Sequence, residues 1–567
     1  MARRSVRINR RDFLRLSGAG LAGATLLGVA GCGGGEIQGG QGGGGGSSSS
    51  IFTFGQGADP VTLDPIHITD SESSKVARQM FDGLLDFAPE STDVIPALAT
   101  EVPEPEDGGR VYTFNLREGV KFHDGEPFNA NAVVFNFERW KNSKNPYHKG
   151  GGSQTSNFSY YQNYFGGFDD ESIIENVEAV DERTVRFTLR EPLGPFLDNI
   201  AISNFGMASP KAIKEDVENF WQNPVSTGPF EFVSWNRGTE VKLEQNSDWW
   251  GGDVPESQGG GGPNVKQVFV RGIPDNTSRT AALTGGELTA ADGLTPDDIP
   301  TVEQAENLKI TYRPPLTIGY MAMNVQKEPF DQREVRQAIN MAINMPEIVK
   351  AFFGDTGQVA TTYIPPTVSF FDDSIKHYPY DPERARQMLQ DVGVQNLSVD
   401  FWYMPIPRPY MPDGKGIAQA MQQNLQEVGI NAKLQTREWG TYLTETGRGV
   451  HDMCLLGWSG DNGDPSTFLD SLLKSSAATE TNALNVAYYK NPQVDDLLNQ
   501  ALSTTDQSER EQAYLRAQEI VVEDAPWVPI AYVKPPVGLQ NSVQGFLPNP
   551  TGGEPWNSVR LGAGGGA

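Results

Sequence analysis

The sequence predicts an α/β fold with room for two or more domains. Strand and helix patterns alternate between residues 397 and 458, and helical spacing of apolar residues runs through 333–353. Earlier in the chain, apolar and polar residues alternate over 111–116, as in a half-buried strand. The chain has 567 residues. Even without a leader and tether of about 50 residues, the body is long enough to bury a large core.

The first half of the body is expected to be rich in strands. It opens with the apolar run 51–54, and a second alternating segment follows at 183–189. A hairpin is expected where 230–233 pairs with 241–243 across a turn at 236–238. Helical spacing predicts helices over 71–84, 131–140 and 275–283, and the glycines of 251–263 predict a surface loop.

The second half of the body is expected to begin with helices and continue with alternating units. Two helices are predicted within 333–353, and the second begins near Asn344, because Pro346 and Glu347 are typical of a helix N-terminus. The patterns that follow predict strand 397–404, helix 416–428, strand 430–436 and strand 453–458.

The N-terminus has the features of an export signal. It is basic, and residues 16–31 then carry no charge. Arg10 and Arg11 lie just before this stretch and, with Phe13 and Leu14, resemble the twin-arginine signal, which exports folded proteins. The uncharged stretch is shorter than the roughly 20 apolar residues of a spanning helix. We therefore expect a signal peptide over 1–32 rather than a permanent anchor.

Cys32 is the expected lipidation site. It closes the segment Val29-Ala30-Gly31-Cys32, which resembles a lipoprotein processing site. Residues 33–50 are nearly all Gly and Ser and read as a flexible tether. The protein is thus expected to be exported and held to the cell membrane through the lipid on Cys32, facing either the periplasm or the cell exterior.

The net charge and the cysteine content limit the classes of partner and the cysteine chemistry that can be expected. The net charge is −27, from 45 basic and 72 acidic residues, which argues against nucleic acid and anionic membrane surfaces as partners. The second of two cysteines, Cys454, lies in an apolar run and is expected to be a buried free thiol.

Motifs of common enzymes are missing from the sequence. The five histidines show no paired metal spacing, and there is no phosphate-binding Gly-rich loop. The segment Gly457-Trp458-Ser459-Gly460-Asp461 lacks the final glycine of a nucleophile elbow. His123 is expected to make a structural hydrogen bond. We therefore expect no enzyme activity, no metal and no cofactor.

Several segments together resemble the extracytoplasmic solute-binding proteins of the peptide and nickel class, family 5. They are Tyr112 through Gly125, Val133 through Arg139, Thr227-Gly228-Pro229-Phe230, Asp248-Trp249-Trp250, and Val335 through Ile339. The resemblance implies the two-lobed, type II binding-protein fold in its large form, with two crossover strands as hinge. Lobe one is then 51–312 with 530–567, including an inserted subdomain at about 85–220, and lobe two is 313–529.

Two further segments, 404–410 and 457–465, resemble the dipeptide-binding branch of that family. In dipeptide binders an arginine of the first segment holds the ligand carboxylate and the first aspartate of the second holds its ammonium. This carries over onto Arg408 and Asp461. The resemblance thus implies an ABC importer subunit that binds short peptides, dipeptides above all, and passes them to permease and ATPase subunits as a monomer.

The residues by themselves allow the same site. Arg408 and Asp461 each follow the carboxyl end of a predicted strand, where ligands bind in open α/β sheets. Guanidinium and carboxylate suit the two ends of a zwitterionic peptide. Physical reasoning alone leaves open that Arg408 is a surface residue and Asp461 a turn former.

Aromatic residues near these positions have two interpretations, pocket and core. Trp458 is assigned to the pocket, whereas Trp402 and Trp439 are expected in the core. Asp464 is expected to cap the helix that starts near Pro465.

Alternative functions remain open at this point. The same fold takes oligopeptides, nickel chelates, haem or oligosaccharides in related families, which the resemblance also allows. From other classes, a peptide-sensing receptor subunit and an exported hydrolase are the alternatives, and the missing catalytic motifs argue against the hydrolase.

Overall fold

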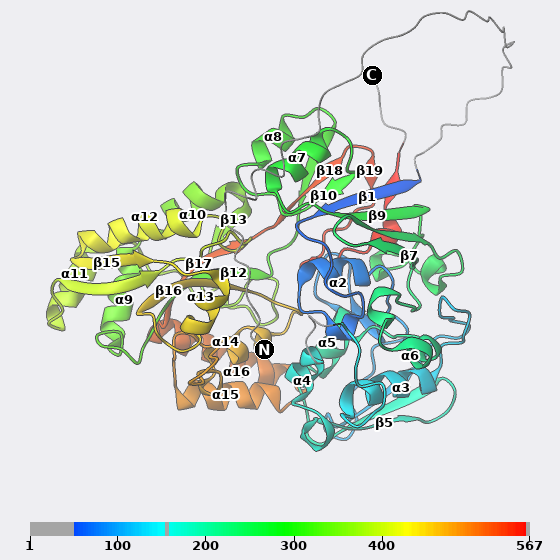
Figure 1. Cartoon of the computed structure of the whole chain (residues 1–567). Coiled ribbons are helices and arrows are strands. Elements are labelled where there is room, and N and C mark those ends of the chain that lie inside the picture. Colours follow the sequence, from blue (N-terminus) through cyan, green and yellow to red (C-terminus); the bar gives the residue numbers. More distant parts are fainter. Residues whose placement is uncertain (1–49, 153–157, 563–567) are drawn as a thin grey trace, which may run out of the picture. The chain divides into compact units, whose positions relative to one another are not determined.

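The computed structural model describes residues 50–152 and 158–562, and these are built around two large sheets (Figure 1). The first sheet has the strand order β11-β18-β10-β1-β9-β8-β7, and the second has the order β13-β17-β12-β16-β14-β15. We call the part around the first sheet lobe one and the part around the second lobe two. The signal peptide and tether predicted over 1–50 lie almost wholly outside the described residues.

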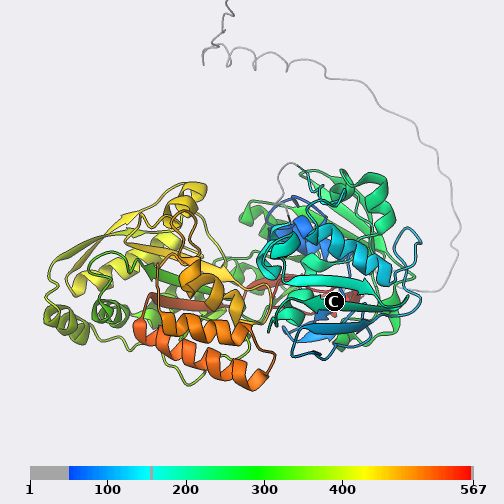
Figure 2. The same cartoon turned by 90° about the horizontal axis from the view of Figure 1, so that it is seen from below.

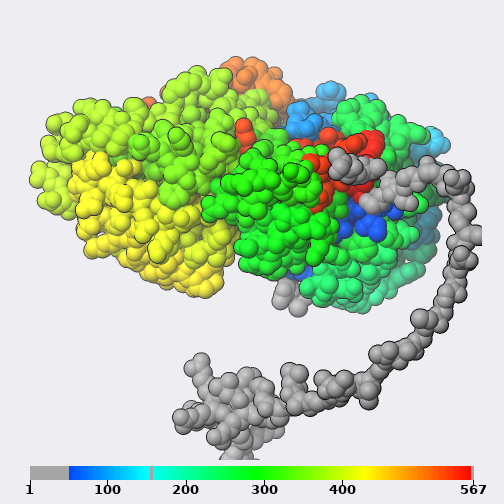
Figure 3. Space-filling view, turned by 90° about the horizontal axis from the view of Figure 1, so that it is seen from above, coloured from blue at the N-terminus to red at the C-terminus, as the bar shows by residue number. Residues whose placement is uncertain are grey.

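Lobe one is assembled from distant segments of the chain. Its large sheet contains β1 (Ile51–Gln56), β7 (Phe230–Asn236), β8 (Glu240–Gln245), β9 (Gln267–Gly272), β10 (Ala290–Ala291), β11 (Leu308–Tyr312) and β18 (Pro536–Gln540). The C-terminal β18 lies between β10 and β11. Figure 3 shows the same pairing from outside, where residues near 300 in green lie beside C-terminal residues in red. Three helices belong here: α2 (Ser71–Ala77), α7 (Asn276–Thr284) and α8 (Ile299–Glu303).

Smaller sheets complete lobe one. An inserted layer contains β4 (Val111–Asn115), β6 (Thr184–Leu189) and β5 (Ile174–Ala179), with α3 (Ala130–Lys141), α4 (Ser159–Phe165), α5 (Phe196–Ile200) and α6 (Pro210–Asp216). Two short pairs are β2 (Leu85–Phe87) with β3 (Val94–Pro96), and β19 (Val543–Gln544) with β20 (Arg560–Leu561). The inserted layer has its own apolar core, in which rings such as Phe114, Phe137 and Phe187 pack edge to face.

Lobe two has one sheet with helices packed against it. The strands are β12 (Thr317–Met323), β13 (Gly357–Val359), β14 (Leu397–Trp402), β15 (Ile430–Gln435), β16 (Met453–Ser459) and β17 (Trp527–Val533). The helices are α9 (Arg333–Ala342), α10 (Met345–Phe353), α11 (Pro382–Asp391), α12 (Gly414–Glu427), α13 (Trp439–Thr446), α14 (Leu469–Leu473), α15 (Pro492–Leu502) and α16 (Gln507–Asp524). Figure 2 shows α15 and α16, in orange, packed side by side.

Most of the elements predicted from residue patterns are present. The strands β4 and β6 and the helices α3, α7, α9 and α10 lie within one or two residues of their predictions, and the β7–β8 hairpin is present with β7 three residues longer than predicted. The helix predicted over 71–84 is wrong in length, because α2 ends at Ala77. Beyond that point the carbonyls of Gln79 and Met80 accept hydrogen bonds from the backbone of Phe230 and Gly228, so they leave the helical path.

The chain crosses between the large sheets twice. It leaves β11 at Tyr312 and enters β12 at Thr317, and it leaves β17 at Val533 and enters β18 at Pro536. The backbone N–H of Arg313 donates to the carbonyl of Pro535 at 3.0 Å, so the two crossovers lie side by side. The lobe boundaries proposed from sequence stay a prediction, and the proposed change at 530 lies inside β17, which pairs with β12 of lobe two up to Tyr532.

A buried cluster of charges holds the first crossover to lobe one. Arg313 is 7% exposed and forms ion pairs with Glu554, through both Nε and Nη2, and with Asp292 at 3.1 Å. Asp292 also accepts from Lys75 Nζ at 2.6 Å. Burial acts to raise the pKa of Asp292, but Lys75 and Arg313 outweigh it and lower this pKa to about 2. The carboxylate therefore stays charged and fixes Arg313.

Replacing Arg313 with Met should lower the free energy of unfolding by about 3–5 kcal/mol, because Glu554 would be left buried without its cation. Arg333 is the matched control, since it is 45% exposed and pairs with Glu523 at the surface. Arg333→Met should cost less than about 1 kcal/mol. Denaturant unfolding followed by tryptophan fluorescence measures both, and an equally small loss in the two variants would contradict this role of Arg313.

Candidate functional site

The order of strands in lobe two brings the two predicted site segments to one sheet edge. β14 and β16 are parallel neighbours, with Trp402 opposite Cys454. Arg408 follows β14 and Asp461 follows β16, so both come after the carboxyl ends of adjacent parallel strands. This edge is where loops converge and where ligands bind in such sheets.

Asp461 reaches from lobe two to lobe one. Its carboxylate accepts hydrogen bonds from the hydroxyls of Tyr164 at 2.6 Å and Tyr160 at 3.1 Å, both on α4. Burial raises the pKa of Asp461, and the two hydroxyls lower it in part. Within the described residues no basic side chain forms an ion pair with it. The carboxylate is thus held by neutral donors, and its charge has no protein cation.

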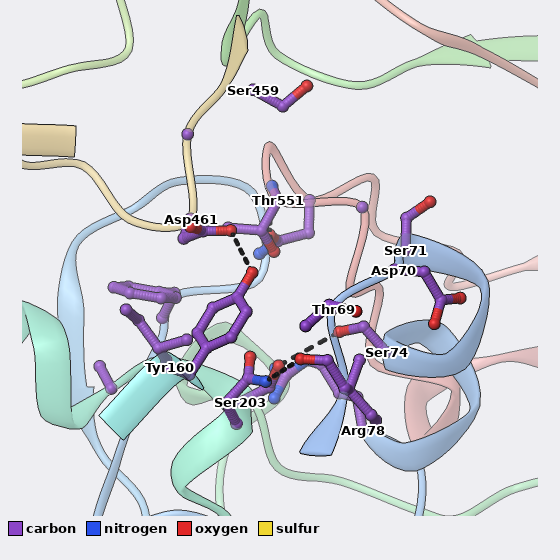
Figure 4. A pocket seen from close by; sticks show the side chains of 18 of the residues that line it. Thr69, Asp70, Ser71, Ser74, Arg78, Tyr160, Ser203, Ser459, Asp461 and Thr551 are labelled. Carbon is purple, nitrogen blue, oxygen red and sulfur yellow. Dashed lines mark hydrogen bonds between the residues drawn. The ribbon is translucent and has the colours of Figure 1, made fainter. Parts of the chain in front are cut away.

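A polar cavity of about 210 Å³ lies on the lobe-one side of Asp461. Figure 4 shows the Tyr160 hydroxyl turned toward Asp461, with Ser74 and Ser203 hydrogen-bonded to each other across the cavity. The Arg78 side chain lines this cavity, and its guanidinium already donates hydrogen bonds to Asp86 at 2.8 Å and to the carbonyl of Gly553 at 2.6 Å. The remaining wall is mixed: hydroxyls, amides and carboxylates alternate with the apolar side chains of Ile68, Phe87, Ala201 and Ile202.

A larger cavity of about 440 Å³ lies on the other side of Asp461, and we call it the aromatic cavity. It shares Tyr160, Ser459 and Asp461 with the polar cavity. Its other lining residues all belong to lobe two: Tyr320, Tyr410, Trp439, Leu443, Thr446, Leu456, Gly457, Trp458, Leu472, Asn482, Ala483, Leu484 and Val486. Asp461 therefore stands between a polar and an apolar space.

Arg408 is exposed and lies next to the aromatic cavity. Its guanidinium carbon is 5.4 Å from the ring centroid of Trp439, which lines that cavity. Its backbone exchanges two hydrogen bonds with Met411, which closes a tight loop. Trp439 was predicted to be a core residue; its partly buried ring does pack against the core of lobe two, and it also forms part of the cavity wall.

Two glycines allow the loop that contains Arg408 to pack closely against the sheet. Gly319 of β12 and Gly457 of β16 lie directly opposite each other. A Cβ at either position would come within 2.3 Å of the Tyr410 carbonyl oxygen or 2.1 Å of the Tyr410 ring. The missing side chains therefore make room for Tyr410, two residues after Arg408, to pack flat against the strands.

The lobes also meet beside the loop that follows Asp461. The Asn462 side chain donates to Asn199 of lobe one at 3.1 Å. A Cβ on Gly463 would lie 2.2 Å from the Thr92 hydroxyl of lobe one, so only glycine permits this approach. Thr92 in turn donates to the carbonyl of Thr367 at 3.2 Å. The structure therefore represents the lobes in contact around Asp461.

The structure also shows the surroundings of the other residues for which the sequence predicted a role. Trp402 is 2% exposed and in the core, and Cys454 is a buried free thiol, as predicted. Asp464 caps the turn at Ser466, and the His123 ring bonds the Gly228 carbonyl. Trp458 is half-buried and lines the aromatic cavity, and its contact with a ligand stays a prediction.

Sequence reasoning missed Tyr160 and Tyr164. They are four residues apart, so they share one face of α4. The spacing could have indicated that the two side chains act together. It could not have indicated that they contact Asp461, because that residue lies about 300 positions later in the chain, in the other lobe. The predicted residues Arg10, Arg11 and Cys32 lie outside the described residues, so these stay predictions.

Two searches of the described part of the chain gave negative results. None of its helices is long and apolar enough to cross a membrane. Residues 50–152 and 158–562 also contain no cluster of His, Cys, Asp and Glu side chains able to hold a metal ion.

Residues 93–480 match the protein family described as bacterial extracellular solute-binding proteins, family 5 Middle. The match spans more than half of the chain. The chain belongs to this family. Family 5 proteins are solute-binding components of transport systems, so this protein is a binding protein and not an enzyme, as predicted.

Individual relatives agree with the family assignment. The dipeptide-binding protein of Escherichia coli K12 is 33% identical over 494 residues, covering 85% of this chain and 89% of that protein. The heme-binding protein A of Haemophilus influenzae is 32% identical over 91% of this chain and 93% of that protein. The periplasmic binding protein DppA of Helicobacter pylori, solved with peptide STSA, is 32% identical with a TM-score of 0.74, covering 90% and 98%. The two-lobed fold predicted from the resemblance is thereby confirmed.

An acidic cluster lies behind the site of this family 5 protein, where α5 of lobe one meets lobe two. Burial, with Asp464 adding to it and Arg510 opposing it, raises the pKa of Asp198 to about 7. Burial likewise raises the pKa of Asp470 to about 7. Arg510 pairs directly with Asp464. The cluster therefore holds more carboxylates than nearby cations.

Asp198→Asn should stabilise the protein at pH 8 but not at pH 4. A carboxyl whose folded pKa is raised loses stability as pH rises from about 4, its unfolded value, through about 7. The neutral amide removes that loss, and the gain at pH 8 should be about 1–3 kcal/mol for this half-buried group.

Thermal melts at both pH values measure the effect. Asp496→Asn, at an exposed position of α15, is the control and should leave the melting temperature unchanged within a degree or so. A gain of equal size at both pH values would rule out the titration of Asp198 as its cause.

Proposed function

We propose that this family 5 protein binds short peptides, dipeptides above all, between its lobes and delivers them to the permease and ATPase subunits of an ABC importer. One observation carries the proposal: Asp461 is a half-buried carboxylate that no basic side chain of the described residues pairs with, and it borders both cavities. An ammonium group is the chemistry that such a carboxylate lacks.

The two ends of the ligand would be held differently. Its ammonium would pair with Asp461, which keeps acceptor capacity beyond the two tyrosine hydroxyls because a carboxylate has about four lone-pair positions. Its carboxylate would pair with the Arg408 guanidinium, which lies over Trp439 at the aromatic cavity. Because Asp461 is the more buried of the two, its pair should contribute more to affinity.

The relatives support the ligand class. The E. coli relative is a dipeptide-binding protein, and the H. pylori structure holds a peptide. The alternative within the fold is a longer or different ligand, as the heme-binding relative illustrates. A ligand with one charged end missing would leave Asp461 or Arg408 unpaired, which argues for a zwitterion of fixed length.

Export and anchoring complete the proposal and rest on the sequence. We infer that Arg10 and Arg11 direct twin-arginine export and that Cys32 carries a lipid after cleavage, so that the protein works as a tethered monomer outside the cytoplasm. The Gly and Ser residues of 33–50 would give the body free reach to its permease.

Calorimetric titration with free and N-acetylated dipeptides tests the proposal. Free dipeptides should bind, and acetylation should abolish binding because it removes the ammonium group. Asp461→Asn should weaken binding of free dipeptides by about 2–5 kcal/mol, roughly two decades or more. Binding that is indifferent to acetylation and to Asp461→Asn, or binding of cellobiose alone, would overturn the ligand assignment and leave the fold intact.

Tyr164→Phe should weaken dipeptide binding about tenfold, because it removes one hydrogen bond to a charged group, worth about 1.5 kcal/mol or more. Tyr161→Phe is the matched control on the same helix, since its hydroxyl bonds Ser172 inside lobe one. The control should leave dipeptide affinity unchanged. Equal affinities of the two variants would show that the hydroxyl of Tyr164 does not support Asp461 in the bound state.

A further inference from the structure

The aromatic cavity carries information about the ligand beyond its two charged ends. Five aromatic rings line it, and most of the remaining wall is aliphatic: Tyr160, Tyr320, Tyr410, Trp439, Trp458, Leu443, Leu456, Leu472, Leu484 and Val486. Its volume of about 440 Å³ exceeds that of the polar cavity, about 210 Å³. A space of this size lined by rings fits a large apolar group.

Charged groups are scarce in the wall of the cavity, and two of its hydroxyls are already engaged. Among the described residues that line it, Asp461 is the one charged residue. The Thr446 hydroxyl donates to the carbonyl of Tyr442 at 2.8 Å, and the Tyr160 hydroxyl donates to Asp461. With Asp461 engaged by the ammonium, a charged ligand side chain would therefore meet no side chain of opposite charge there, which is costly.

The polar cavity on the opposite side of Asp461 is smaller and more polar than the aromatic cavity. Asp70, Arg78, Asp86 and several serine and threonine hydroxyls line it, beside the apolar side chains of Ile68, Phe87, Ala201 and Ile202. A large apolar side chain placed there would cover these groups without satisfying them. An apolar side chain attached beside an ammonium at Asp461 thus has one favourable direction, into the aromatic cavity.

We propose that the aromatic cavity receives the side chain of the ligand's first residue, so that the protein selects peptides with an aromatic or large aliphatic N-terminal residue. The inference rests on the proposed function, because the ammonium at Asp461 is what brings the first residue to the cavity. The first residue is the one concerned, since its Cα is bonded directly to that ammonium. The lining side chains of lobe two are then the specificity-determining residues.

Titration of the purified protein with a matched dipeptide series tests this inference. The series is Phe-Gly, Leu-Gly, Gly-Gly, Lys-Gly and Glu-Gly, with Gly-Phe to separate the two positions. Phe-Gly and Leu-Gly should bind about tenfold to a hundredfold more tightly than Gly-Gly, as expected for burying a large apolar side chain. Lys-Gly and Glu-Gly should bind no better than Gly-Gly.

Variants at the rim test which residues set the preference. Leu443 and Leu484 line the cavity and are 43% and 46% exposed, so a charge there is tolerated by the fold. Measured relative to Gly-Gly binding by the same variant, Leu443→Glu should weaken Phe-Gly and strengthen Lys-Gly, each by several-fold. Val450→Glu is the control, since Val450 is 50% exposed and does not line the cavity. Ala483→Phe, which fills the cavity, should weaken Phe-Gly more than Gly-Gly.

The outcomes separate this inference from the proposed function. If no free dipeptide binds, the proposed function fails and the inference fails with it. If Gly-Gly and Phe-Gly bind equally and acetylation abolishes both, the proposed function stands and the inference is overturned. A preference for Gly-Phe over Phe-Gly, or identical effects of Leu443→Glu and Val450→Glu, would also overturn it.

Discussion

The ion cluster of Arg313 with Glu554 and Asp292 is the constraint on which the arrangement of the two sheets depends. In the part of the chain that the structure describes, two short crossovers join the sheets, and one of them begins at Arg313. A buried arginine with two carboxylates tolerates little displacement, because any separation leaves charges unpaired in a low-dielectric interior. The crossover is thereby fixed to lobe one, whereas the other end of each crossover continues into a strand of lobe two. Motion between the lobes is thus confined to a few residues.

Asp461, a half-buried acid, has the opposite kind of electrostatic environment. Arg313 and Lys75 neutralise Asp292 and lower its pKa, whereas burial prevails at Asp461 and raises the pKa. Two tyrosine hydroxyls orient the Asp461 carboxylate without cancelling its charge. The protein therefore bears the cost of a charge that it does not pair internally, and that arrangement is characteristic of a binding site rather than of a structural ion pair.

Sequence patterns predicted local structure well and contacts between lobes poorly. The alternation in 111–116 and the helical spacing in 333–353 reflect burial on one face, which neighbours in the chain determine. Helix α2 was predicted too long because the carbonyls of Gln79 and Met80, just beyond its end, accept hydrogen bonds from the backbone of Phe230 and Gly228. Those partners lie far along the chain, so the pattern of neighbouring residues does not reveal them. Trp439 was assigned to the core for a related reason: an apolar ring suits a core and a cavity wall equally, and only the packing of α13 distinguishes them.

The residues proposed to bind the ligand are divided unequally between the lobes. This division bears on whether the ligand binds before or after the lobes close. Tyr160 is the one residue of lobe one among the described residues that line the aromatic cavity, so lobe two alone presents Asp461, Arg408 and nearly all of the apolar wall. A ligand would therefore meet most of its contacts on lobe two before the lobes close. Tyr160 and Tyr164 of α4 bond Asp461 from lobe one, so these two contacts require the lobes to lie together as they do here. In the proposed binding mode the ligand's ammonium would offset the cost of burying the Asp461 carboxylate between the lobes, and it would favour closure through that difference.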